Sequence, residues 1–120
     1  MDQFINAYRA AFQRYADFSG RTSVGGFWRF VAVNLAVVIV FGILIQVSGI
    51  FFWAYLLYAL AVIVPSLAIA VRRLHDTGKS GWLLLVGLIP FVGWIILIVF
   101  YVQPSENAAN QWGPPPPPGA

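Results

Sequence analysis

Long apolar runs separated by short polar segments are the dominant pattern along this chain. Three such runs cover about residues 27–46, 50–71 and 82–101. About twenty helical residues at ~1.5 Å each extend about 30 Å, the thickness of the hydrocarbon core of a membrane. The break at residues 47–49 is so short that the first two runs must form an antiparallel hairpin. The pattern therefore predicts an all-α integral membrane protein with a bundle of three transmembrane helices.

A different spacing precedes the first run. Apolar residues between positions 2 and 17 recur every three or four residues, which is the period of one helical face. They are Phe4, Ile5, Tyr8, Ala11, Phe12 and Tyr15. We expect an amphipathic helix over residues 2–17, and two uses of its apolar face stay open. This face lies at the headgroup boundary of the membrane, or it packs on the protein's own helices.

The segments outside the apolar runs are rich in residues that end helices. Glycine and serine indicate a loop over residues 18–26, in which Thr22 or Ser23 caps the next helix. Residues 1–103 then form a single membrane domain, and residues 104–120 form a polar, proline-rich tail. The prolines at 114–118 favour an extended polyproline II conformation. A disordered terminus is a simpler expectation than a ligand for a proline-binding domain.

The composition excludes an ordinary soluble domain. Charged residues make up 9% of the 120 residues, against about 25% in soluble proteins, so much of the apolar surface needs lipid as its solvent. The chain has no cysteine, which excludes disulfides and thiolate chemistry. The net charge of +3 points to anionic lipid headgroups rather than nucleic acid, because the basic residues border apolar runs. The N-terminus lacks the charged-then-apolar order of a cleavable signal peptide.

All the basic residues lie near the ends of the apolar runs. If all three runs cross the membrane, these residues fall on the same side of it. They are Arg9, Arg14, Arg21, Arg29, Arg72, Arg73 and Lys79. Because lysine and arginine are enriched in cytoplasmic loops, we predict a multi-pass protein of the bacterial cytoplasmic membrane with its N-terminus in the cytoplasm. Three spans place the C-terminus outside. We expect three spans rather than two, on the argument that two spans would divide the basic residues between the two sides.

The polar segment 72–82, which we call the polar hinge, holds three of the seven basic residues and the only histidine. Its Gly-Lys-Ser at 78–80 is not a phosphate-binding loop, because Arg73 stands where that motif has a glycine and an apolar helix precedes it. His75 and Asp76 are adjacent, which does not fit a Ser-His-Asp triad, and they are too few ligands for a metal site. We therefore predict no catalytic, cofactor-binding or metal-binding residue, and no cofactor.

Two prolines interrupt the apolar runs. Pro65 lies about two turns before the end of the second run, and Pro90 lies near the middle of the third. Each removes a helix hydrogen bond, so we expect a helix kink at both positions. Interrupted helices build transport sites in some proteins, but ion coupling usually needs a charged residue inside the membrane, and the interiors of these runs have none. A transport or channel component formed by an oligomer is therefore our alternative function.

Several short motifs occur together in a distinctive order. They are Phe18-Ser19-Gly20-Arg21-Thr22-Ser23, Phe27-Trp28, Pro65-Ser66-Leu67-Ala68, the polar hinge, Pro90-Phe91-Val92-Gly93 and Asn110-Gln111-Trp112-Gly113-Pro114. Over about residues 4–115 the chain resembles the domain of unknown function 805 family, the YhaH-like bacterial inner-membrane proteins. The resemblance implies a small polytopic inner-membrane protein, with no catalytic residue to carry over. Family members usually have a basic residue and a glutamate where this chain has Val-Gly-Gly at 24–26, which argues against a loop carboxylate that pairs with the hinge arginines.

We expect the loop and the polar hinge to pack together as one basic surface on the cytoplasmic side. This surface would comprise Arg21, Arg72, Arg73, His75, Asp76 and Lys79, with Trp28 and Trp82 as anchors at its membrane edge. Asp76 would be the counter-charge of Arg21 or Arg72. The predicted function is a non-enzymatic interaction or scaffold protein that binds anionic lipid or a membrane-protein partner, a second copy included, through this surface. Lipid anchoring alone would also account for the charges.

Overall fold

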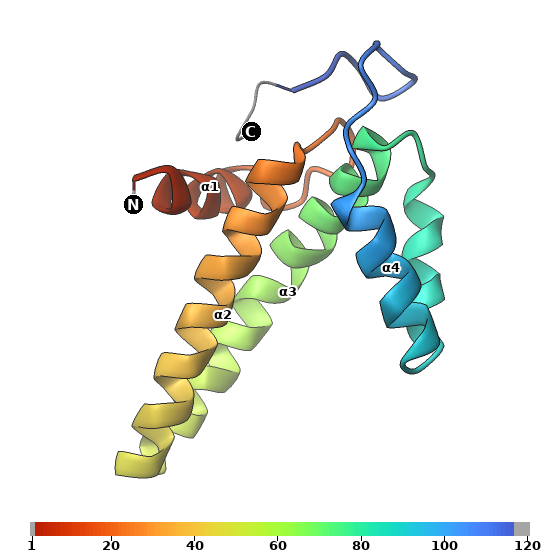
Figure 1. The fold of residues 1–120 in the computed structure, drawn as a ribbon. Coiled ribbons are helices and arrows are strands. Elements are labelled where there is room, and N and C mark those ends of the chain that lie inside the picture. Colours follow the sequence, from red (N-terminus) through yellow and green to blue (C-terminus); the bar gives the residue numbers. More distant parts are fainter. Residues whose placement is uncertain (1, 117–120) are drawn as a thin grey trace.

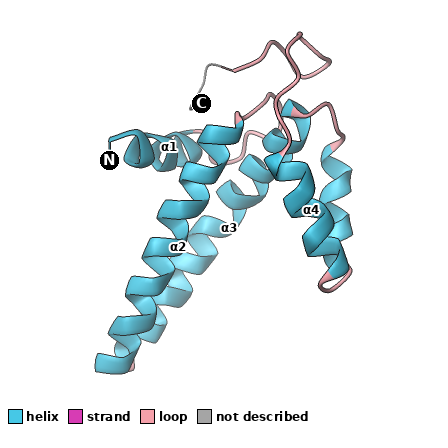
Figure 2. Cartoon of the chain, in the orientation of Figure 1, coloured by secondary structure: helices cyan, strands magenta, loops and turns pink. Residues whose placement is uncertain are grey.

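Helices form the regular elements of residues 2–116, the part of the chain that the computed structural model describes (Figures 1 and 2). In chain order they are α1 (Asp2–Gln13), α2 (Val24–Val47), α3 (Ile50–Asp76), the 3-10 helix η1 (Gly81–Leu88) and α4 (Val92–Val102). The prediction of an all-α protein is confirmed.

Helices α2 and α3 form the long hairpin that the first two apolar runs predicted (Figure 1). Their 24 and 27 residues are long and apolar enough to cross a membrane. Only 6% and 22% of their most apolar windows are buried inside the protein, unlike the core helices of a soluble domain. Ser23 begins α2 as its N-cap, because its Oγ accepts a hydrogen bond from the backbone N–H of Gly26 at 3.0 Å. Helix α3 ends at Asp76 and so takes in the first half of the polar hinge.

Helix α1 lies across the α2–α3 hairpin near its polar end (Figure 1). It ends at Gln13, four residues before the predicted end. Ala7 and Ala11 are buried, and the ring of Tyr8 stacks on Phe30 of α2 with centroids 5.4 Å apart. The hydroxyl of Tyr8 also hydrogen-bonds that of Tyr58 at 2.5 Å. One part of the apolar face therefore packs on the protein's own helices, while three of its large residues stay exposed, namely Phe4, Ile5 and Tyr15.

The third predicted span is wrong as a continuous helix. Residues 82–101 divide into η1 and α4, which meet at a turn around Pro90 and run back along each other (Figure 1). Pro90 lacks an N–H and so ends a helix, and Phe91 adopts a φ of +61°. Gly93 permits the close packing, because a Cβ there would overlap the carbonyl of Val86. Each arm is about 16 Å long, so neither crosses about 30 Å of hydrocarbon.

The return of α4 places the tail at the same end of the molecule as the loop. Arg21 donates hydrogen bonds to the carbonyls of Ala108 and Gly113, both at 3.1 Å. The prediction that the tail lies across the membrane from the loop is therefore wrong for residues up to 113. The charge pattern could not reveal this, because the η1–α4 hairpin contains no charged residue. The charge argument for three spans thus fits two spans and a hairpin equally well.

Two other predictions about prolines have different outcomes. Pro90 lies in the turn between η1 and α4 rather than at a kink within a span. Pro65 is buried inside α3, which continues on both sides of it, and the kink there stays a prediction. The polyproline stretch at 114–118 extends past residue 116 and lies partly outside the described residues.

Candidate functional site

The loop that carries Arg21 is fixed to α3 by backbone contacts. The backbone N–H of Thr22 donates to the carbonyl of Arg72 at 3.1 Å. Gly20 has a φ of +83°, in the left-handed region that glycine adopts without a steric penalty. A Cβ at Gly20 would also lie 2.9 Å from Nη2 of Arg14. The glycine therefore lets the chain turn tightly enough to direct Arg21 toward the end of α3.

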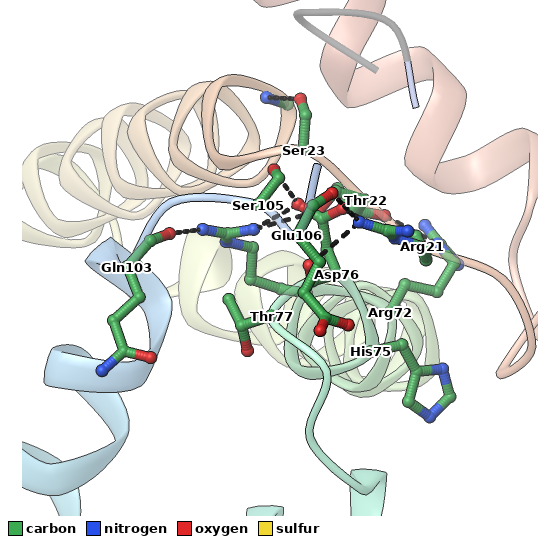
Figure 3. Close-up of polar contacts among 12 residues, drawn as sticks. Arg21, Thr22, Ser23, Arg72, His75, Asp76, Thr77, Gln103, Ser105 and Glu106 are labelled. Atoms are coloured by element: carbon green, nitrogen blue, oxygen red, sulfur yellow. Dashed lines mark hydrogen bonds and ion pairs between the residues drawn. The ribbon is translucent and has the colours of Figure 1, made fainter. Parts of the chain in front are cut away.

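Arg21 uses every N–H donor of its guanidinium. Its Nε donates to Oδ1 of Asp76 at 2.9 Å, and its Nη2 donates to the carbonyls of Asp76 at 3.1 Å and Glu106 at 2.8 Å. With the two Nη1 bonds to Ala108 and Gly113, all five donors of the group are paired. Arg21 thus ties together the loop, the end of α3 and the tail (Figure 3).

Asp76 lies between two arginines. Its Oδ2 accepts a hydrogen bond from Nη1 of Arg73 at 2.6 Å, while Oδ1 faces Arg21. The hydroxyl of Ser105 donates to Oδ2 as well, and the backbone N–H of Glu106 donates to the Asp76 carbonyl at 2.9 Å. The carboxylate is fully buried, so its two ion pairs and its hydrogen bonds must offset a large desolvation cost.

The remaining guanidinium donors reach mainly backbone carbonyls. Nε of Arg73 donates to the carbonyl of Tyr101 at 3.0 Å, and its Nη2 donates to that of Gln103. Arg72 has no carboxylate partner among residues 2–116: its Nε donates to Oγ1 of Thr22 at 2.9 Å and its Nη1 to the carbonyl of Asp17 at 2.8 Å. Backbone dipoles rather than acids therefore stabilise much of the buried positive charge.

His75 and Lys79 lie at the margins of this cluster. Nδ1 of His75 is 3.0 Å from the carbonyl of Gly20, and its ring stacks on Trp112 of the tail at 4.2 Å with an interplanar angle of 5°. Lys79 is half-buried, and its Nζ donates to Oε1 of Gln103 at 2.5 Å. Desolvation, together with the positive charge of Arg73, lowers the pKa of Lys79.

The structure brings the six predicted residues together but buries five of them, so the expected exposed surface is wrong. Arg21, Arg72, Arg73, His75 and Asp76 are each at most 6% exposed. The physical reason is that tail carbonyls cover the guanidinium groups of Arg21 and Arg73, while the segment between α1 and α2 covers that of Arg72. Asp76 pairs with Arg21 as predicted, but its second partner is Arg73 rather than Arg72. We call these five residues and Ser105 the buried polar core.

The two predicted tryptophan anchors differ from each other. Nε1 of Trp28 donates to the carbonyl of Tyr101 at 3.3 Å, so this half-buried side chain holds α4 against α2. Trp82 at the start of η1 is 80% exposed, the position expected of a membrane-interface anchor. Only Trp82 therefore has the exposure that the prediction requires.

Sequence reasoning missed the residues of the tail that complete the buried polar core. Backbone carbonyls at 106, 108 and 113 have no side-chain signature, so no pattern could identify them. The one available signal was the motif Asn-Gln-Trp-Gly at 110–113, in which Nδ2 of Asn110 donates to the His75 carbonyl at 3.0 Å. A second missed group is the polar contact of Tyr8, Tyr58 and Asn34, which joins α1, α3 and α2.

Comparison with known proteins relates the loop, the core and the tail to one family. Residues 15–114 match the family described as "Protein of unknown function (DUF805)". The chain is 34% identical over 110 residues to the "Inner membrane protein YhaI" of Escherichia coli (strain K12), covering 91% of this chain and 93% of that protein. It is 36% identical over 117 residues to the "Inner membrane protein YhaH" of the same strain, covering 91% and 94%. No solved structure matches the chain.

Proposed function

We propose that this chain, which belongs to the DUF805 family of inner-membrane proteins, is a non-enzymatic interaction protein whose cytoplasmic end binds anionic lipid. In this proposal α2 and α3 cross the membrane, the η1–α4 hairpin enters it and returns, and α1 lies in the interface. The buried polar core then acts as a rigid support that orients the cytoplasmic end.

The charge distribution supports this topology. All seven basic residues lie in or just after α1, in the loop, in the first turns of α2 or in the polar hinge. The contacts of Arg21 bring these segments and the tail to one end of the molecule, and the positive-inside rule makes that end cytoplasmic. Both the loop and residues 103–116 are then cytoplasmic, in place of the sidedness predicted from three spans.

The single observation that carries the proposal is the division of the polar residues at this end into two sets. The buried set pairs internally, and its only carboxylate, Asp76, is held between two guanidinium groups rather than poised as a proton acceptor. The other set holds the exposed or half-buried charges, in which the cations Arg9, Arg14, Arg29 and Lys79 outnumber the carboxylates Asp2, Asp17 and Glu106. A cation near an anionic membrane surface contributes about 1 kcal/mol to binding, so this second set favours anionic headgroups.

The exposed residues of α1 support an interfacial position for this helix. Phe4 and Ile5 of α1 and Tyr15 just after it are between 39% and 46% exposed, and Arg9 is exposed on α1. Aromatic and aliphatic side chains beside arginine suit the boundary between headgroups and acyl chains. Because the rest of α1 packs on α2, the helix would hold the hairpin at a fixed depth in the interface.

Anionic-lipid binding is tested with the full-length protein in nanodiscs that contain phosphatidylglycerol and phosphatidylcholine with identical acyl chains. The triple variant Arg9→Gln, Arg29→Gln, Lys79→Gln should retain less phosphatidylglycerol relative to phosphatidylcholine than the wild type does. The expected reduction is roughly fivefold for each cation removed, the factor that about 1 kcal/mol represents. The control Asp2→Asn, which removes an exposed negative charge, should not reduce the enrichment. Unchanged enrichment in the triple variant would overturn the proposal. Loss of a co-purifying protein with unchanged lipid enrichment would indicate that these cations bind a protein partner instead of lipid.

Transport by an oligomer stays a prediction, which flux across reconstituted vesicles would test.

A further inference from the structure

A pocket of about 500 Å³ lies between the end of α3, the start of η1 and the tail. Apolar side chains line most of it, among them Val71, Leu85 and the two tryptophans 82 and 112, while His75 and Ser80 contribute polar atoms. Its volume is in the range of small-molecule sites. The proposed binding of anionic lipid does not use this pocket, and the loop residue Arg21 does not line it.

The contact of His75 with Gly20 determines which of its ring nitrogens carries the proton. A backbone carbonyl only accepts hydrogen bonds, so the 3.0 Å contact with the Gly20 carbonyl makes Nδ1 the donor. In the neutral ring Nε2 is then an acceptor with a free lone pair. Figure 3 shows the ring directed away from the ion pairs of Asp76. The acceptor atom Nε2 is therefore not part of the ion-pair cluster around Asp76.

That acceptor faces the pocket. The position that a Cβ of Gly81 would occupy lies 3.5 Å from Nε2 of His75, and both residues line the pocket. Nε2 has no hydrogen-bond partner among residues 2–116, although His75 is only 6% exposed. Because no buried side-chain nitrogen or oxygen of residues 2–116 lacks a partner, Nε2 is accessible from the pocket, where water or a ligand can donate to it. The pocket thus offers the histidine acceptor in largely apolar surroundings, with Ser80 as a second polar side chain.

The rim of the pocket indicates where its ligand comes from. Trp82 is 80% exposed and Leu85 is 56% exposed, so the pocket adjoins the apolar outer side of η1. The hydroxyl of Ser80 accepts a hydrogen bond from the N–H of Trp82 at 3.3 Å, which leaves its own proton free for a ligand oxygen. A ligand that suits this site has an apolar chain, an acceptor oxygen and a hydrogen-bond donor. A membrane phospholipid supplies all three.

We propose that this pocket binds a phospholipid whose headgroup ends in a primary ammonium group, the phosphatidylethanolamine class. The ammonium donates to Nε2 of His75, a phosphate oxygen accepts from Ser80, and an acyl chain follows Val71 and Leu85. Phosphatidylcholine has the same phosphate and chains but no N–H donor, so the site discriminates against it. The inference rests on the proposed membrane position of η1 but not on anionic-lipid binding.

The test uses the full-length protein in vesicles with equal amounts of dioleoyl phosphatidylethanolamine and dioleoyl phosphatidylcholine. After mild extraction, native mass spectrometry counts the lipids that stay bound. The wild-type protein should retain about tenfold more of the ethanolamine lipid, the factor that one hydrogen bond from a charged group provides. Equal retention of the two lipids would overturn the proposal.

Two histidine variants separate the role of the acceptor from that of the fold. His75→Asn places its amide where Nδ1 lies, so it keeps the bond to Gly20 but lacks the acceptor at Nε2, and its preference should fall to about one. His75→Gln places an oxygen near the Nε2 position and should keep most of the preference. A retained preference in His75→Asn would contradict the proposal. Leu85→Trp, which fills the pocket from its exposed rim without touching His75, should abolish the preference even if neither histidine variant folds. The enrichment of phosphatidylglycerol in nanodiscs should persist in all three variants, so the two proposals fail separately.

Discussion

Arg21 and Asp76 are 55 residues apart in sequence, yet Nε of the arginine lies 2.9 Å from Oδ1 of the aspartate, and their side chains are 1% and 0% exposed. This buried ion pair joins a loop before the first long helix to the end of the second. The same arginine then reaches three carbonyls of the tail. One guanidinium group therefore determines how three distant segments meet at one end of a membrane protein.

Removal of the Asp76 charge should destabilise the protein severely. Asp76→Asn keeps the size of the side chain but leaves two buried guanidinium groups without a counter-charge, and losing one partner of a buried pair costs about 3–5 kcal/mol. Thermal unfolding in detergent should show a large fall in the midpoint. The matched control is Asp17→Asn, whose pair with Arg14 is more than one-third exposed and should contribute at most about 1 kcal/mol. Equal effects of the two variants would refute a special role for the buried pair.

Reducing the number of hydrogen-bond donors at position 21 should release the tail. Arg21→Lys keeps the charge, but an ammonium has three donors and cannot reproduce the five hydrogen bonds of the guanidinium. We expect limited proteolysis to cut the chain within residues 103–113 several-fold faster than in the wild type. The control is Arg9→Lys, at an exposed position of α1, and it should not change the rate of cleavage. Tail cleavage that is as slow in Arg21→Lys as in the control would show that other contacts hold the tail.

Single cysteines can establish on which side of the membrane each segment lies, because the native chain has none. Ser19→Cys in the loop and Asn107→Cys in the tail are both exposed and should react with an impermeant thiol reagent only from the cytoplasmic side. Gly49→Cys, in the turn between α2 and α3, should react only from the opposite side. Labelling of Asn107→Cys from the same side as Gly49→Cys would restore the arrangement of three spans.

The η1–α4 hairpin should depend on the absence of a side chain at position 93. A Cβ on Gly93 would overlap the carbonyl of Val86, so Gly93→Ala must separate the two arms at a cost of about 1–3 kcal/mol, typical of overpacking. The matched control is Gly42→Ala in α2, where a Cβ meets nothing within 4 Å. We expect a lower thermal midpoint for Gly93→Ala and little change for Gly42→Ala. A midpoint unaffected by Gly93→Ala would argue against the close packing of the two arms.

The residues of the buried polar core show how far sequence reasoning reached. The concentration of Arg72, Arg73 and Asp76 in one segment identified the site, and shared sidedness correctly associated it with Arg21. The same reasoning failed on exposure, because charged side chains are almost never fully buried unless they are paired. Most of the partners of the guanidinium groups here are backbone carbonyls, four of them in the tail, and every residue carries one. Their selection depends on where the chain returns, which no local pattern encodes.

The sequence by itself determined the features that depend on solvent and helical period: an all-helical inner-membrane protein, its two long helices, their tight turn and a helix cap at Thr22 or Ser23. These features depend on hydrophobic length and on the chemistry of neighbouring residues, which are local properties. Only the tertiary structure decided that the third apolar run folds back at Pro90, because twenty apolar residues satisfy the length of one span as well as that of a hairpin. That return places the tail over Arg21 and Asp76. It thereby converts an expected basic surface into a buried core, since carbonyls brought close by the fold replace water around the guanidinium groups.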